Sequence, residues 1–174
     1  PMDFFIKVTG ATHIKAYRIE TFPLGIGSQY RNALFSRTLM LNCLTDAYSS
    51  LWQSAWVASF LAESWSCNDK RLKSFSTLSQ DWRWDTPLRN PFERRQALVE
   101  IDVISAMALG FKLNELIMMY EVLFPILAQN ENDTWYDSNG KIVFTANKGL
   151  GGVGLERNIR EQNQDAYAVI NFGH

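Results

Sequence analysis

Residues 90–110 read NPFERRQALVEIDVISAMALG, and this stretch decides the fold because it carries the signals of a complete buried helix. Asn90 is a typical N-cap residue, Pro91 stands at the first helical position, and Glu93 follows three residues after the cap, as in a capping box. Gly110 supplies the C-terminal stop. Apolar residues cover two faces between these ends: Ala97, Ile101, Ile104 and Ala108 on one, and Val99, Val103 and Met107 on the other. This wide apolar circumference predicts the central helix of a helical core.

Helical patterns are present on both sides of this segment. From Ser36 onward the apolar spacing predicts one long amphipathic helix that ends near residues 60–63, on the evidence of Leu41, Leu44, Tyr48, Leu51 and Ala55. The polar segment that follows this predicted helix contains scattered aromatic residues and extends to Pro91, and we expect it to be an ordered loop. Downstream, Asn114 is expected to cap a helix on which Leu116, Tyr120, Leu123 and Leu127 align. Pro125 must kink or restart that helix near Phe124, because proline cannot donate a backbone hydrogen bond.

A β-hairpin is predicted over residues 135–144, WYDSNGKIVF, because Asn139-Gly140 fits a two-residue type I′ turn. Counting outward from this turn pairs Ser138 with Lys141, Asp137 with Ile142, Tyr136 with Val143 and Trp135 with Phe144. Residues 1–24 are expected to be a short β remnant, and residues 25–174 a helical domain that contains the hairpin. The sequence therefore predicts an α+β, mainly α fold: a helical core with one β-hairpin and a small N-terminal β remnant.

Composition excludes several classes of protein. The 174 residues are 47% hydrophobic and 20% charged, with a net charge of -1, which excludes a disordered tail and a supercharged nucleic-acid arm. Two cysteines and two histidines support neither a disulfide framework nor a four-ligand zinc site. The sequence contains no membrane-spanning run and no signal peptide, so we expect a cytoplasmic protein without a membrane partner. The start at Pro1-Met2 suggests that the sequence is a piece of a longer chain.

No catalytic centre, metal site or cofactor site is predicted. Residues 149–154 match G-x-G-x-x-G, but the acidic residue that a dinucleotide fold needs about 20 positions later, on a second parallel strand, is missing, so we interpret them as a glycine loop. Glu100 and Asp102 lie about 200° apart around a helix and cannot share a substrate. We expect such a carboxylate to anchor Arg94, Arg95 or a backbone amide instead.

The run Trp82-Arg83-Trp84 allows two interpretations. Aromatic rings beside arginine suit the stacking of nucleotide bases. The acidic flanks Asp81 and Asp85 argue against that use and favour indole rings that fasten a loop to the core.

The two ends of the chain differ in charge. Residues 1–40 contain five basic and two acidic residues, a net charge of +3, whereas residues 113–165 contain four basic and eight acidic residues, a net charge of -4. The basic end includes the loop Thr9-Gly10-Ala11-Thr12-His13. That end is a candidate for phosphate contacts, and an ordinary solvated surface is the alternative.

The run VTGATHI (8–14), followed by Tyr17 and ETFPL (20–24), resembles the end of the target-recognition region in Eco57I-like adenine-specific DNA methyltransferases. The helical stretch after that region is similar to NPFERRQALVEID (90–102), ALGF (108–111) and LNEL (113–116). The C-terminal module of large phage-defence members looks like FPIL (124–127), NENDTWYD (130–137), NGKIVFT (139–145) and KGL (148–150). These patches together extend over most of the chain.

The resemblance implies a non-catalytic part of a larger enzyme, because the family's Asn-Pro-Pro-Tyr motif and glycine-rich S-adenosylmethionine motif are absent. Residues 1–24 would be the trailing edge of the DNA target-recognition region, and the chain would support target recognition in a restriction-modification (type II or IIG) or phage-defence methyltransferase. S-adenosylmethionine would bind only in the parent enzyme, which would methylate adenine and could carry a restriction nuclease. Double-stranded DNA would be the partner, and the residues expected to contact it are Lys7, Thr9, Thr12, His13 and Lys15.

The alternative function is a protein-interaction module. Exposed aromatic side chains and the acidic C-terminal half would then dock partner subunits of a defence complex.

Overall fold

The computed structural model describes residues 27–144. In this range five α-helices and three short 3-10 helices precede a two-stranded antiparallel sheet, so the mainly helical fold class is confirmed. The elements are α3 (Ser28–Asn42), η1 (Asp46–Tyr48), α4 (Ser49–Ala55), η2 (Ala58–Ala62), η3 (Phe75–Thr77), α5 (Pro91–Ala108), α6 (Leu113–Leu123), α7 (Pro125–Asn132), β1 (Trp135–Tyr136) and β2 (Ile142–Phe144). The expected N-terminal β remnant and the glycine loop at 149–154 lie outside the described residues.

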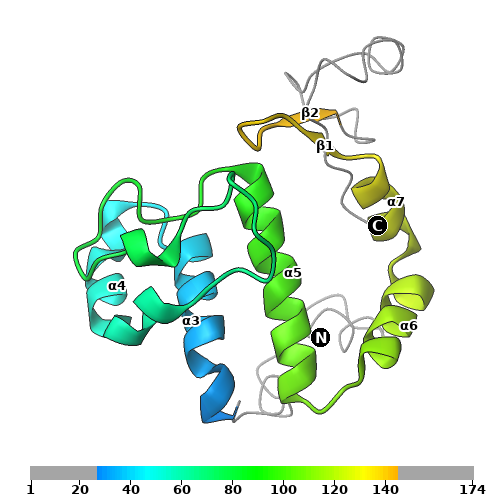
Figure 1. Cartoon of the computed structure of the whole chain (residues 1–174), viewed down its shortest axis with the longest axis horizontal. Helices are drawn as coiled ribbons and strands as arrows, with labels where there is room; N and C mark the ends of the chain where they lie inside the picture. Colours follow the sequence, from blue (N-terminus) through cyan, green and yellow to red (C-terminus); the bar gives the residue numbers. More distant parts are fainter. Residues whose placement is uncertain (1–26, 145–174) are drawn as a thin grey trace.

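Helix α5 occupies the middle of the molecule, as predicted for the segment 90–110. Figure 1 shows α3, α4 and the loops around them on one side of α5, and α6 and α7 on the other. The Asn90 side chain caps the helix by accepting from the Phe92 amide at 2.8 Å. At the other end Gly110 adopts φ +80, and the amides of Gly110 and Phe111 donate to Met107 and Ala106. This hydrogen-bond pair is a Schellman motif, so both predicted ends of the helix are confirmed.

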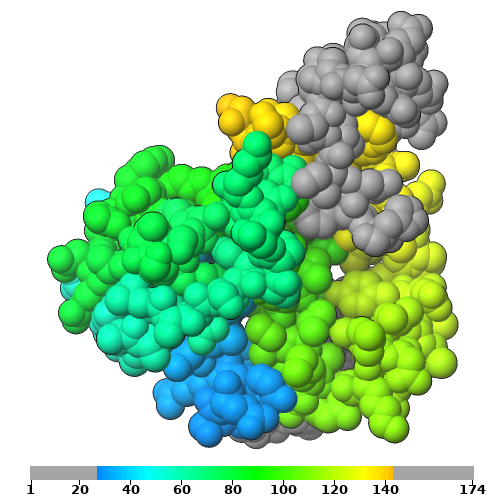
Figure 2. All heavy atoms as spheres, in the orientation of Figure 1, coloured from blue at the N-terminus to red at the C-terminus, as the bar shows by residue number. Residues whose placement is uncertain are grey.

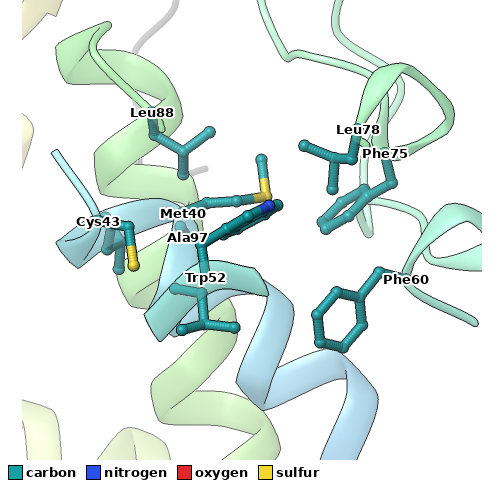
Figure 3. Close-up of a cluster of buried hydrophobic side chains, with 10 residues drawn as sticks. Met40, Cys43, Trp52, Phe60, Phe75, Leu78, Leu88 and Ala97 are labelled. Atoms are coloured by element: carbon teal, nitrogen blue, oxygen red, sulfur yellow. The ribbon is translucent and has the colours of Figure 1, made fainter. Parts of the chain in front are cut away.

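The main hydrophobic core lies between α5, α3 and the segment that connects them (Figure 3). Trp52 from α4 is fully buried there, and its indole N–H donates to the Ser79 carbonyl at 2.9 Å. The buried side chains around it come from five separate stretches of chain and include Met40, Cys43, Phe60, Phe75, Leu78, Leu88 and Ala97. The long segment between α4 and α5 contributes side chains to this core. This packing orders the segment, although its regular structure is limited to the short helices η2 and η3.

The prediction of one long helix from Ser36 to residues 60–63 is wrong. Helix α3 begins earlier, at Ser28, and ends where Cys43 leaves the helical region at φ -78 and ψ 58. The chain then turns through η1 into α4, which ends before the extended residue Trp56. The physical reason is burial: Cys43 and Trp52 both lie in the same core cluster, and a turn brings both halves of the pattern to it.

Helices α6 and α7 are separated at Pro125, as predicted. α6 ends at Leu123, and α7 begins at Pro125 as its first residue. The expected cap at Asn114 is wrong by two residues, because the N-cap of α6 is Lys112, whose amide donates to the Glu115 carboxylate at 2.7 Å. No helix in the described range has the length and apolar character that a membrane span requires.

The hairpin is present, but its predicted turn and part of its register are wrong. Trp135 pairs with Phe144 as expected, whereas Tyr136 pairs with Ile142 across a bulge. In the turn only Gly140 has a positive φ, at +74, so the turn is not type I′, which needs two such residues. The side chain of Asp137 decides the geometry, since it accepts from the amides of Asn139 and Lys141 and so favours a three-residue loop.

Candidate interaction surface

Glu100 is the most enclosed carboxylate of the described core, and it is occupied by structural partners. It accepts from Arg37 Nε at 2.6 Å, from the backbone and hydroxyl of Ser66 at 2.7 Å each, and from Gln96 Nε2 at 2.8 Å. Burial alone would raise the pKa of the Glu100 carboxyl, but the hydrogen bonds from Ser66 and Gln96 and the charge of Arg37 together hold that pKa below its usual range. With every contact directed at the protein itself, this group ties α3, the loop after η2 and α5 together.

The expectation of an anchoring carboxylate is therefore confirmed for Glu100, with different partners. The arginine is Arg37 instead of Arg94 or Arg95, and the backbone amide is that of Ser66. Arg94 donates to the Leu41 and Leu88 carbonyls, at 3.0 and 3.1 Å. Sequence spacing could not identify Arg37, because it lies 63 positions away from Glu100.

Asp102 points away from Glu100, as predicted, and belongs to the opposite side of α5. It accepts a hydrogen bond from the Tyr120 hydroxyl and so joins α5 to α6. Burial, together with the Asp102 carboxylate, raises the pKa of Tyr120 well above its usual range. Because that phenol stays protonated at physiological pH, the contact is a fixed structural link.

A small hollow of about 160 Å³ lies beside Arg95, α7 and β1. Its cation is not free, because Arg95 pairs with Glu131, which also lines the hollow. The hollow therefore has no net charge with which to attract an ionic ligand.

The two tryptophans of the loop 82–84 differ in how they contact the rest of the molecule. Trp82 fastens the loop to the core, since its indole N–H donates to the Cys43 carbonyl at 2.8 Å. Trp84 does not, because 69% of its surface is exposed and its ring carries the Arg89 guanidinium 3.5 Å from the ring centroid. The interpretation that the indole rings fasten the loop to the core is thus confirmed for Trp82 and wrong for Trp84.

The predicted DNA contacts, Lys7, Thr9, Thr12, His13 and Lys15, lie outside the described residues. Within the described range, six of the seven arginines donate to or pair with a carbonyl or carboxylate of this chain, and Arg31 stacks over Phe35. Arg71, for example, pairs with Asp69 and lies over the Phe92 ring. These arginines hold loops in place and are not gathered for phosphate binding.

The most unusual surface of the described molecule is apolar and lies along α6 and α7. We call it the α6–α7 apolar face; its exposed fractions range from 41% to 72%, and it consists of Leu113, Ile117, Met118, Val122, Ile126 and Leu127. Of the sixteen exposed large hydrophobic residues in the described range, nine fall between Met107 and Leu127, so they are concentrated in one segment. Figure 2 shows α6 and α7 at the outer edge of the molecule.

The face exists because α6 is apolar on more sides than the fold can cover. Leu116 is buried, and Tyr120 and Leu123 are half-buried on the side directed at α5. Ile117, Met118 and Val122 project from the other side of the same helix. Of the residues predicted to align along this segment, Leu116, Tyr120 and Leu123 are buried or half-buried, whereas Leu127 is 41% exposed. The apolar residues at 117, 118 and 122 form a second set that this alignment leaves out.

Carboxylates interrupt this apolar face. Glu121 lies four residues after Ile117 and three after Met118, so it occupies the same exposed side of α6, and Glu115 lies one turn before Met118. Between residues 113 and 140 the sequence contains five Asp or Glu residues and no Lys or Arg. Of these five, Glu131 is paired with Arg95 and Asp137 lies in the hairpin turn, so Glu115 and Glu121 are the carboxylates that give the α6 part of the face its negative charge.

Comparisons with known proteins find no matching family model, no matching curated protein and no matching solved structure. Among the described residues no group of three or more His, Cys, Asp or Glu side chains is placed to hold a metal ion.

Proposed function

We propose that this chain is a non-catalytic interaction module and that the α6–α7 apolar face is the surface with which it docks another protein. The observation that carries the proposal is the exposure of six large apolar side chains on two consecutive helices. Large apolar side chains that gather on one exposed segment of a folded domain are typical of a docking site. It corresponds to the interaction-module alternative, although the surface is built of aliphatic residues and methionine instead of aromatic ones.

Burial of this face would contribute substantially to the free energy of binding. Complete burial of a large apolar side chain contributes about 1.5–3 kcal/mol, so the exposed portions of these six side chains represent on the order of 5–10 kcal/mol before the cost of association. The polar clusters offer no comparable source, because Glu100, Asp102 and Arg95 already have partners within the chain.

DNA recognition as part of an adenine-specific methyltransferase remains the prediction from the sequence resemblance. It depends on residues 7–15, and the arginines of the described range add no phosphate-binding cluster to it. Both roles are compatible with one chain, since they use different parts of it.

Site-specific photocrosslinking tests the docking role. A benzophenone amino acid in place of Met118, in the full chain and in the cells that express it, should form one predominant adduct with another protein. The matched control carries the same group in place of Leu51, an exposed apolar residue of α4 that is 50% accessible. The adduct at 118 should disappear when Val122→Lys is added.

Two results would contradict the docking role. One is equal crosslinking at positions 118 and 51, which would indicate non-specific capture. The other is an adduct within the chain itself, which would show that the face is covered internally.

A further inference from the structure

Glu121 restricts what can cover the α6–α7 apolar face. Residues three and four apart on a helix are neighbours, so a partner that buries Ile117 and Met118 must also pass over Glu121. None of the ion pairs among the described residues involves Glu121, and it is exposed. Burying a carboxylate without a partner is strongly unfavourable. A tight-fitting partner must therefore bring hydrogen-bond donors to this position, and a Lys or Arg meets this need best because it also offsets the negative charge.

A second copy of this chain does not satisfy that requirement through the same face. In a twofold contact the same patch lies on both sides of the interface, so the face would meet its own carboxylates. The segment 113–140 contains no Lys or Arg, and the cation nearest to it in sequence, Lys112, stands at the N-terminal end of α6, nine positions before Glu121. Like charges placed opposite each other oppose association. The charge pattern favours a different molecule.

From this juxtaposition we infer that the occupant of the α6–α7 apolar face is a basic amphipathic segment of another protein, with aliphatic side chains against Ile117, Met118 and Val122 and a Lys or Arg opposite Glu121. The inference rests on the proposed docking function and adds the chemistry of the partner. Amphipathic helices that lay an apolar stripe on an exposed apolar surface are a common mode of peptide recognition. The basic residues on such a segment would supply the positive charge that is absent from residues 113–140.

Designed peptides test the inference directly with the full chain. The probe is a fluorescein-labelled helical peptide of about 14 residues, roughly 21 Å long, with leucine at helical spacing and lysine elsewhere. Two matched peptides replace every lysine with glutamine or with glutamate. Binding is measured by fluorescence anisotropy at low and at high salt.

We expect the leucine–lysine peptide to bind and the leucine–glutamate peptide not to bind. Glu121→Gln should weaken the leucine–lysine peptide about three- to tenfold, as expected for the loss of one partly buried ion pair of about 0.7–1.4 kcal/mol. Val122→Thr, a nearly isosteric change at a position that is 70% exposed, should weaken it by a similar factor without altering the melting temperature. Asp81→Asn removes the same charge from an exposed loop position and should change binding less than about twofold.

Each contrary outcome has a defined meaning. Equal losses for Glu121→Gln and Asp81→Asn would indicate general charge attraction and overturn the inference. Leucine–glutamine binding that equals leucine–lysine binding and is sensitive to Val122→Thr would overturn the basic partner while leaving the docking function intact. Absence of any peptide binding would also overturn the inference. The docking function would still be tested separately by the crosslinking at position 118. A dimer that Val122→Thr dissociates would assign the face to a second copy.

Discussion

Glu100→Gln should be among the most destabilising conservative substitutions in this chain. The change keeps the side chain's size but replaces a carboxylate oxygen with an amide NH2 group. Four donated hydrogen bonds now converge on the carboxylate, from Arg37, Ser66 and Gln96. At least one donor would then face another donor, and Arg37, only 3% exposed, would lose its closest counter-charge.

The size of the effect follows from these contacts. Removing one partner of a buried ion pair typically costs about 3–5 kcal/mol. Arg37 keeps hydrogen bonds to the Ala33 and Ser64 carbonyls and a contact with Glu63 at 3.4 Å, so we expect the lower end of that range, about 3 kcal/mol. For a domain of this size the loss corresponds to a decrease in Tm of roughly 10–15 °C.

Thermal and urea unfolding followed by circular dichroism would measure this loss. A double-mutant cycle with Arg37→Met separates the Arg37–Glu100 coupling from the hydrogen bonds of Ser66 and Gln96. Glu63→Gln, at the more exposed acid beside Arg37, is the matched control and should cost less than about 1 kcal/mol. A Glu100→Gln variant that unfolds within about 1 kcal/mol of wild type would refute the assignment of this cluster as the main polar tie of the fold.

Four further outcomes are expected. Because the folded-state pKa of Glu100 lies below its unfolded value of about 4.3, its contribution is present above that pH, so melting curves from neutral to acidic pH should show the gap between wild type and Glu100→Gln narrowing as the pH falls. Gly140→Ala should destabilise the chain by more than about 1 kcal/mol in urea unfolding, because φ is +74 and the new Cβ would clash with the Asn90 side chain. Changing Lys7 and Lys15 together to Ala should weaken binding to all duplexes about equally and flatten the salt dependence by roughly two units, with the pair Lys141 and Lys148 as control; no binding at low salt would contradict the DNA role. Labelled S-adenosylmethionine and DNA should yield no methyl transfer by this chain, and incorporation above background would contradict its non-catalytic assignment.

Local signals in the sequence predicted the parts of the fold that local physics determines. The cap at Asn90, the stop at Gly110 and the break at Pro125 each depend on one residue and its immediate neighbours. The pairing of Trp135 with Phe144 was also correct. The hairpin turn was wrong because the Asp137 side chain competes for the same amides, which a dipeptide rule does not include.

Long-range contacts explain most of what the sequence could not provide. The turn at Cys43 that replaces the long helix is stabilised by burial with Trp52, Phe60 and Phe75, and no spacing rule contains that information. The partner of Glu100 is 63 residues away for the same reason. The α6–α7 apolar face could be predicted only in part. The apolar residues at 117, 118 and 122 are evident in the sequence, but whether another element covers them depends on the tertiary arrangement.

The distribution of arginine connects the fold with its proposed function. Proteins that bind DNA through a folded surface keep Lys and Arg free for phosphates. In the described range the arginines instead order a loop-rich segment by donating to carbonyls, as Arg37 does to Ser64 and Arg89 to Leu44. The outer surface that remains on α6 and α7 is apolar and acidic, which repels phosphate and suits a basic protein segment. The two functional hypotheses are therefore separable within one chain, because substitutions at Glu121 and Val122 should leave DNA binding unchanged and substitutions at residues 7–15 should leave peptide binding unchanged.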